Sequence, residues 1–314
     1  MSRFTDIDLA KLPAADVIET LDYEALVTAL KTKLVTLGAE IGLDLSGVMA
    51  LESEPLVKLM ENFAYHEMIL RGRVNDAAKA VMPAYAIGTD LDHLAARNGV
   101  VRLVLEPADN TTTPPTPAVM EDDERLRARM QLALEAFTTA GSYGAYLFHV
   151  LAIAGVLDCE AYGPESGLVQ PAEVLLVILA RDNGGTADAA LLETVRQNIT
   201  ADEKRPLSDH VMIESAEIIT YDVVIDVEVL PGPDMALVKN QLEAAVQAYV
   251  ENQFRVGRAI RRVGLGGIGY IEGVHNDIQV SSPAADVVPT LRQAARCNSI
   301  AVNVTQIPGR WFNG

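Results

Sequence analysis

The chain has 314 residues, a length that suggests two or three domains of ordinary size. Its 25 Lys and Arg against 43 Asp and Glu give a formal net charge of −18. This balance argues against a nucleic-acid-binding surface, which needs clustered basic residues. With 49% hydrophobic and 22% charged residues, the composition excludes disorder and indicates a soluble, folded protein.

The sequence predicts no targeting or membrane segment. Residues Met1–Lys11 include two acids and no apolar run, so they do not form a secretory signal. The longest apolar stretches, such as Val174–Ala180, are far shorter than the roughly 18–20 residues of a membrane-spanning helix. We therefore expect no contact with a membrane.

The first 105 residues have the periodicity of helices. Apolar residues recur every three or four positions over Asp22–Gly42, which predicts one helix. A longer helix is predicted over Ser53–Met82, with a proline in its first turn, and a short helix capped by Thr89 and Asp90 follows. Residues 1–105 are thus expected to form an all-helical region.

Residues 106–120 interrupt this pattern. They are rich in Pro and Thr, and because proline fixes φ and lacks a backbone donor, neither a helix nor a sheet is expected to continue through them. We interpret this segment as a loop or linker.

Residues 121–207 are expected to form a middle α+β domain. Two helices lead, over Asp122–Phe137 and from Ser142 to Ala154. The strands Asp158–Tyr162 and Glu173–Ala180 follow, and Asp188–Thr200 returns to helical spacing.

Residues 208–314 are expected to form a C-terminal α+β domain. His210–Leu230 alternates apolar and polar residues, which is typical of half-buried antiparallel strands. A helix over Leu237–Phe254 and strands near Asp277–Val280 and Ser299–Thr305 complete it. The predicted fold class is α+β: an N-terminal helical unit followed by two small mixed α/β domains with short, largely antiparallel sheets.

Residues Gly264–Gly269 match the GxGxxG spacing that lets a backbone approach a pyrophosphate. A dinucleotide fold also needs a buried strand before the glycines and a full βαβ unit after them, and neither is present so close to the end of the chain. A glycine-loosened helix or loop is the preferred interpretation, and the sequence leaves the choice between these two open.

No other pattern indicates chemistry. The five histidines show no metal-binding spacing, and no serine stands in a GxSxG elbow. Cys159 and Cys297 form no zinc or disulfide framework, so we expect two partly buried thiols, with a disulfide between them as the minor alternative. We predict no catalytic, cofactor-binding or metal-binding residue.

Two features indicate contacts with other proteins. The charge of −18 either keeps the chain dispersed or selects basic faces of partners. Near the C-terminus, Trp311 and Phe312 either anchor into a neighbouring protein or pack back on their own domain.

Several blocks of sequence occur in a fixed order along this chain. The blocks begin at Glu54 (EPLVKLMENFAYHE), Leu70 (LRGRVNDAAKAVM), Ala86 (AIGTDLDHLAA), Pro117 (PAVMEDDERLR), Thr139 (TAGSYGAY), Lys204 (KRPLSD), Pro231 (PGP, with Tyr221) and Ser281 (SSPAAD). They resemble the baseplate J-like family of contractile phage tails, and they occur in family order between about residue 22 and residue 305, which makes the resemblance specific. The departure is at Gly264–Gly269, where relatives usually carry better helix formers.

This resemblance implies a structural role without catalysis and without a cofactor. In the family, two copies join a smaller wedge protein through a helical bundle, and the other domains link neighbouring wedges into a sixfold ring around the central hub, with sheath proteins as further partners. It implies a place in a virion tail baseplate or a tailocin particle, assembled in the cytoplasm of the bacterial host. The expected interaction sites are the bundle residues Leu26, Leu30, Leu34, Leu56, Leu59 and Phe63 and the tail residues Trp311 and Phe312, and a hinge is expected at Pro114, Pro115 and Pro117.

Two alternatives remain from the residues alone. The chain is an acidic adaptor unrelated to tails, or a nucleotide-binding enzyme that uses Gly264–Gly269. Gene neighbours that encode tail proteins would discriminate against the first alternative, and a nucleotide that raises the melting temperature would support the second.

Overall fold

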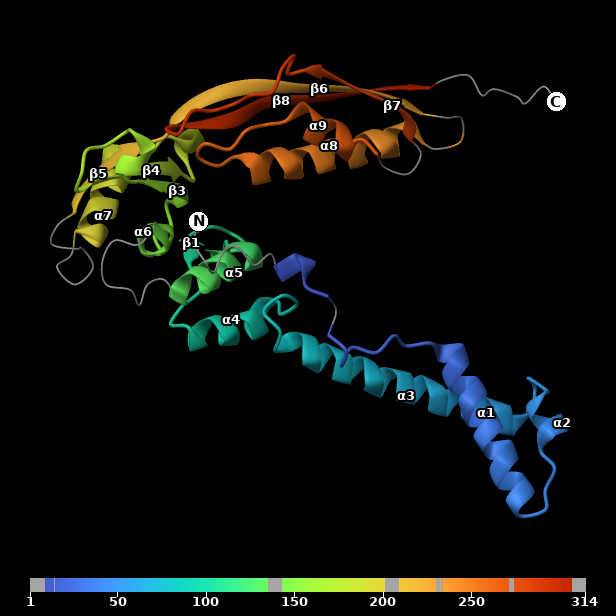
Figure 1. Cartoon of the computed structure of the whole chain (residues 1–314). Coiled ribbons are helices and arrows are strands. Elements are labelled where there is room, and N and C mark those ends of the chain that lie inside the picture. The colour runs from blue at the N-terminus through green and yellow to red at the C-terminus, as the bar shows by residue number, and fades with distance from the viewer. Residues whose placement is uncertain are drawn as a thin grey trace. The chain divides into compact units, whose positions relative to one another are not determined.

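The structure is a computed structural model that describes residues 9–13, 15–134, 143–200, 209–229, 232, 234–270 and 274–306 (Figure 1). The chain divides into two compact units. We call Thr5–Arg102 with Asp122–Met130 the helical unit, and Leu103–Glu121 with Gln131–Gly314 the sheet unit. Helices and small mixed sheets confirm the α+β class.

The helical unit contains the three helices predicted for residues 1–105, which are α1 (Tyr23–Glu40), α3 (Pro55–Ala80) and α4 (Gly88–Arg97). It also contains the short α2 (Ser46–Met49), which was not predicted, and most of α5 (Asp123–Leu132), which was expected to lead the middle domain. The side chain of Asp22 caps α1 by accepting a hydrogen bond from the N–H of Ala25. α1 packs against one face of α3.

The start of α4 differs from its prediction. The helix begins at Gly88, before the predicted caps Thr89 and Asp90, and no local side chain caps it. Instead, the Asp123 carboxylate at the start of α5 accepts the N–H of Gly88 at 3.0 Å. The sequence signal was misleading because this cap comes from 35 residues away.

The Pro/Thr-rich segment is a hairpin, which corrects the expectation that no sheet passes through it. β1 (Val104–Glu106) and β2 (Val119–Met120) pair antiparallel. Asp109 and Thr116 then exchange two backbone hydrogen bonds of 2.9 Å farther along the hairpin. The two short strands pair because prolines occupy the intervening segment and not the strands themselves.

The middle part of the sheet unit has helices on one face of a three-stranded sheet. β3 (Val156–Tyr162) pairs antiparallel with β4 (Glu173–Ala180), which pairs parallel with β5 (His210–Ser215). α6 (Tyr143–Leu151) and α7 (Ala189–Ile199) pack with β3 and β5 around one apolar core. The boundary predicted near residue 207 lies outside the described residues.

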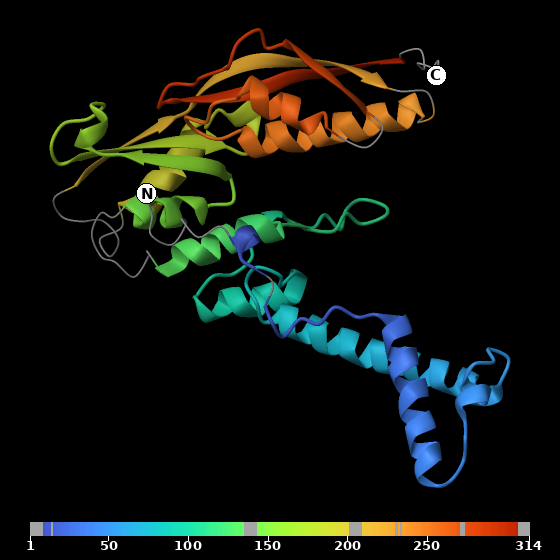
Figure 2. The ribbon, with the colours of Figure 1, turned by 45° about the vertical axis from the view of Figure 1, so that its right-hand side comes forward.

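The second sheet has the strand order β7-β6-β8. β6 (Glu217–Val229) pairs antiparallel with β7 (Val274–Ser282) and parallel with β8 (Gln293–Gln306). α8 (Met235–Gln253) and α9 (Arg262–Ile268) cover one face of this sheet (Figure 2). The alternating segment 210–230 therefore forms two strands of different sheets, and its expected antiparallel pairing holds for β6 with β7 but not for β5 with β4.

A third apolar cluster joins the two sheets. β4 is buried on both faces: one face packs on α6 and α7, and on the other Leu175, Val177 and Leu179 contact Ala216, Val256 and Ala294. Near this cluster the half-buried Asp158 accepts the N–H of Val256 at 2.9 Å. The two sheets consequently form one compact unit.

Candidate interaction surfaces

The long helix α3 has two apolar faces. One face is buried, and the residues on it include Val57, Met60 and Ala64. At its C-terminal half this face is held by Asn75, whose side-chain amide donates to Glu19 O at 2.8 Å and accepts from Glu19 N at 3.1 Å. The chain thus covers this side of α3 with its own residues.

The second face of α3 is exposed. Its large side chains recur at spacings of three, four or seven residues, which places them on one stripe about a third of a turn from the buried face. Each is 40% or more exposed. We call this set of side chains the α3 stripe; its members are Leu56, Leu59, Phe63, Leu70, Val74 and the C-cap residue Val81.

The six predicted bundle residues fall into two groups, one exposed on α3 and one half-buried on α1. Leu56, Leu59 and Phe63 lie on the α3 stripe. Leu26, Leu30 and Leu34 of α1 are half-buried. The sequence pattern merged the two faces of α3, because Val57, Met60 and Ala64 recur with nearly the same spacing as the stripe.

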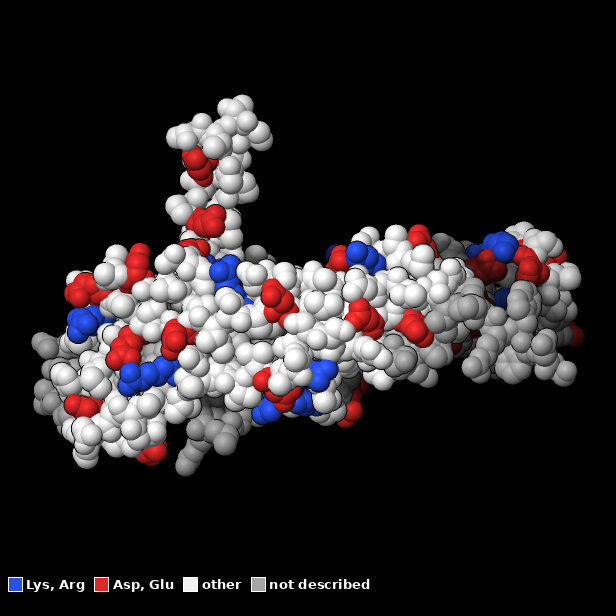
Figure 3. Space-filling view, turned by 90° about the horizontal axis from the view of Figure 1, so that it is seen from above, with Lys and Arg blue, Asp and Glu red and all other residues white. Residues whose placement is uncertain are grey.

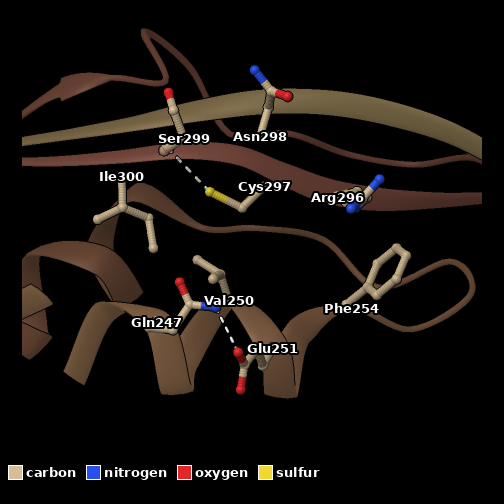
Figure 4. Close-up of a pocket in the computed structure, with 9 residues that line it drawn as sticks. All are labelled: Gln247, Val250, Glu251, Phe254, Arg296, Cys297, Asn298, Ser299 and Ile300. Atoms are coloured by element: carbon tan, nitrogen blue, oxygen red, sulfur yellow. Dashed lines mark hydrogen bonds between the residues drawn. The ribbon is translucent and has the colours of Figure 1, made fainter. Parts of the chain in front are cut away.

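Two separate hollows lie between α8 and β8, the outer strand of the second sheet; we call them together the β8 groove. One is an open hollow of about 420 Å³ in which Cys297 and Ile300 point toward α8 and Gln247 and Val250 point toward β8 (Figure 4). The other is a hollow of about 350 Å³ near the final residues of β8. It is lined by Met235, Ala236, Lys239, Val302, Asn303 and Val304.

The opposite face of the second sheet is polar. Asp222 accepts a hydrogen bond from Ser299 Oγ at 2.6 Å, and Asp226 accepts from Asn303 Nδ2 at 2.7 Å and from Ser281. These bonds to Asp226 lower the pKa of its carboxyl group. The face seen in Figure 3 shows scattered acidic and basic side chains and no broad basic patch.

Two half-buried carboxylates of β3, Asp158 and Glu160, have raised pKa values. Burial raises the pKa of Asp158 to about 6, and it also raises the pKa of Glu160, which accepts a 2.6 Å hydrogen bond from Tyr143. Perturbed acids of this kind occur at active sites, but both have structural partners here. No cluster of three potential metal ligands occurs among the residues that the structure describes.

The remaining predicted sites have these positions. Gly264–Gly269 lies in α9 and its C-cap rather than in a strand-to-helix turn, so its N–H groups do not form a phosphate cradle. Cys159 and Cys297 are both free thiols. Trp311 and Phe312 lie outside the described residues.

The three hinge prolines lie in the exposed part of the hairpin. Asp109 and Thr116 are hydrogen-bonded across it, so bending at Pro114 or Pro115 would move the tip without separating β1 from β2. A hinge at Pro114, Pro115 and Pro117 stays a prediction. Within the described part of the chain, no helix has the length and apolar character required to cross a membrane.

Comparison with known proteins gives consistent matches. The model of the baseplate J-like N-terminal domain matches residues 52–109, and that of the baseplate J-like central domain matches residues 138–215. The chain is 40% identical over 298 residues to a protein named baseplate protein J from Escherichia phage P2. That match covers 94% of this chain and 97% of the phage protein.

Proposed function

Because the chain belongs to the baseplate J-like family, we propose that it is a structural component of a phage tail baseplate. The family membership confirms the resemblance drawn from the sequence blocks. A structural role also agrees with the relative's name, baseplate protein J. No observed feature favours the adaptor or nucleotide-binding alternatives.

The α3 stripe is the observation that carries a more specific role. An apolar surface of this length on a 26-residue helix costs free energy in water and is usually covered by a partner. The partner that fits it is another amphipathic helix, because spacings of three and four residues match the seam of a helical bundle. We propose that the stripe joins a second copy of the chain and a smaller wedge protein.

The sheet unit would then make the ring contacts. Its compact core joins both sheets, and its polar sheet face and β8 groove are accessible. In this proposal the unit links neighbouring wedges around the hub, with sheath proteins nearby, in a virion tail or tailocin assembled in the host cytoplasm.

Light scattering tests the role of the stripe. The chain would be co-expressed with the small wedge protein encoded beside it, and we expect a stable complex with two copies of this chain. Phe63→Glu should abolish that complex because it places a charge inside the apolar seam. The adjacent Asn62 is also exposed, so Asn62→Glu is the matched control and should leave the complex intact.

A wild-type chain that stays monomeric beside this partner would refute the bundle proposal. Equal masses for the Phe63→Glu and wild-type complexes would show that the α3 stripe is not the contact. Circular dichroism of the free variants checks that α3 remains folded, and Phe63 is 51% exposed, so its substitution should not disturb the core.

A further inference from the structure

The outer edge of β8 is open over the second half of the strand. β6 pairs with one side of β8, and Val256 bridges the other side at Ala294. From Ser299 to Gln306, no strand among the described residues pairs with this outer side. The unpaired N–H and C=O groups of such an edge can recruit another strand.

This edge lacks the residues that usually prevent such pairing. The segment 299–306 reads SIAVNVTQ and contains no acidic, basic or proline residue. The other outer strands of the two three-stranded sheets, β3, β5 and β7, each contain an acidic residue. In a chain with a net charge of −18, β8 is therefore the outer strand of these sheets on which two copies can meet without like charges opposite each other.

The apolar residues of this edge are complementary to themselves. We propose that β8 pairs antiparallel with β8 of a second copy, about a two-fold axis perpendicular to the sheet at Val302. Ile300 then lies opposite the partner's Val304, and Val302 lies opposite the partner's Val302. These three residues belong to the core beneath α8, so the apolar side of the sheet continues across the junction.

The polar face matches in the same register. Ser299 lies opposite the partner's Thr305, a pair whose hydroxyl groups form cross-strand hydrogen bonds, and Ala301 lies opposite the partner's Asn303. The paired segment begins directly after the bulge at Asn298 and ends next to Gln306.

Neighbouring registers fit less well. An axis at Ala301 would run the pairing into the bulge at Asn298 after fewer residues. An axis at Asn303 would set the apolar Ile300 opposite Gln306. The residue pattern therefore favours Val302 as the centre.

The pairing joins two copies of the second sheet into one sheet with the strand order β7-β6-β8-β8-β6-β7. A two-fold contact of this kind uses the same surface on both copies and closes as a dimer. It would supply the contact between neighbouring wedges, and in that role it rests on the proposed function. It uses no residue of the α3 stripe.

Sedimentation of the Phe63→Glu chain tests the pairing, because that substitution removes association through the α3 stripe. We expect a dimer. Adding Ala301→Lys should raise its dissociation constant at least about tenfold, because lysine on an edge strand opposes pairing and the two added ammonium groups lie diagonally across the junction. Ala248→Lys is the matched control and should leave the dimer unchanged, because Ala248 is exposed on α8 and does not lie on the edge.

Cysteine crosslinking tests the register. In a Cys297→Ser background, Val302→Cys should form an intermolecular disulfide on mild oxidation, because position 302 lies opposite itself with Cβ atoms about 4.5–5.5 Å apart. Thr305→Cys is the control and should not crosslink, because position 305 lies opposite Ser299. Circular dichroism of each variant checks that the sheet unit remains folded.

Three results would overturn the proposal. The first is a Phe63→Glu chain that stays monomeric at every concentration measured, and the second is a dimer that Ala301→Lys does not weaken. The third is a crosslink at Thr305→Cys with none at Val302→Cys. No readout requires the wedge partner, so failure of this proposal is distinguishable from failure of the α3 stripe proposal.

Discussion

The glycines of α9 allow a sharp test of packing at two nearby positions. Gly267 lies in the last turn of α9, and a Cβ atom there would have no neighbour within 4 Å. Gly269 follows as the C-cap, with the ordinary helical φ of −68°, but its Cβ would lie 2.8 Å from Cδ1 and Cγ2 of Ile278 in β7. The backbone conformation at both positions accepts alanine. The difference in stability between the two variants therefore reports the space available for the added Cβ atom.

We expect opposite effects on stability. Gly267→Ala should stabilise the sheet unit by about 0.5–1 kcal/mol, because alanine loses less conformational entropy than glycine on folding. Gly269→Ala gains the same entropy term but overpacks against a branched side chain at a cost of about 1–3 kcal/mol, so a net loss of about 1–2 kcal/mol follows. For a unit of this size, each kcal/mol corresponds to about 2–4 °C in Tm.

Thermal unfolding followed by circular dichroism measures the difference, and hydrogen exchange of β7 locates it. The double variant Gly269→Ala with Ile278→Val tests the cause, because a smaller side chain at position 278 should recover part of the loss. If Gly269→Ala and Gly267→Ala are equally stable, the close contact between α9 and β7 is not what requires glycine.

Two further substitutions test electrostatic features. The raised pKa of Asp158 contributes stability that is complete below about pH 4 and is lost as pH rises through about 6, a change of about 3 kcal/mol at about 1.4 kcal/mol per pH unit. In Asp158→Asn the free energy of unfolding, measured with urea, should therefore change less with pH between pH 4 and 7 than in the wild type. If its pH dependence equals that of the exposed control Asp182→Asn, the assignment to Asp158 is contradicted. Arg102, whose side chain is 12% exposed, bridges carboxylates of α4 and α5 at 2.7 Å each, so Arg102→Ala should destabilise the helical unit by about 2–3 kcal/mol. The exposed Arg97→Ala should change thermal stability by less than about 0.5 kcal/mol, and similar melting curves for the two alanine variants would count against the bridge.

The sequence predicted elements whose patterns are local. α3, β4 and α7 begin and end close to their predicted positions, because helical spacing, an apolar run and an Asp188 N-cap act over a few residues. Pairing is not local. Nothing within 210–230 shows that β5 joins β4 while β6 joins β7 and β8, since alternation specifies a buried face but not a neighbour.

The candidate surfaces were predictable to a similar extent. Leu56, Leu59 and Phe63 could be selected as apolar helix residues, but their exposure depends on which face α1 covers. The β8 groove has no sequence signal, because it is formed by α8 and β8, which lie far apart along the chain. The glycine motif forms a helix, as the preferred interpretation allowed, and its first and last glycines lie against Tyr249 and Ile278.

The parallel pairing of β6 with β8 has a mechanical consequence. The two strands pair from Glu217–Gln293 to Val229–Gln306, with one bulge after Tyr221, and β6 follows β5 directly along the chain. Tension applied between the start of β6 and the end of β8 pulls the strands past each other, so the ladder is loaded in shear. All its hydrogen bonds then resist together, whereas in an unzipping geometry they would break one at a time. Force applied between these two ends is therefore carried by the whole ladder, and the sheet resists unravelling.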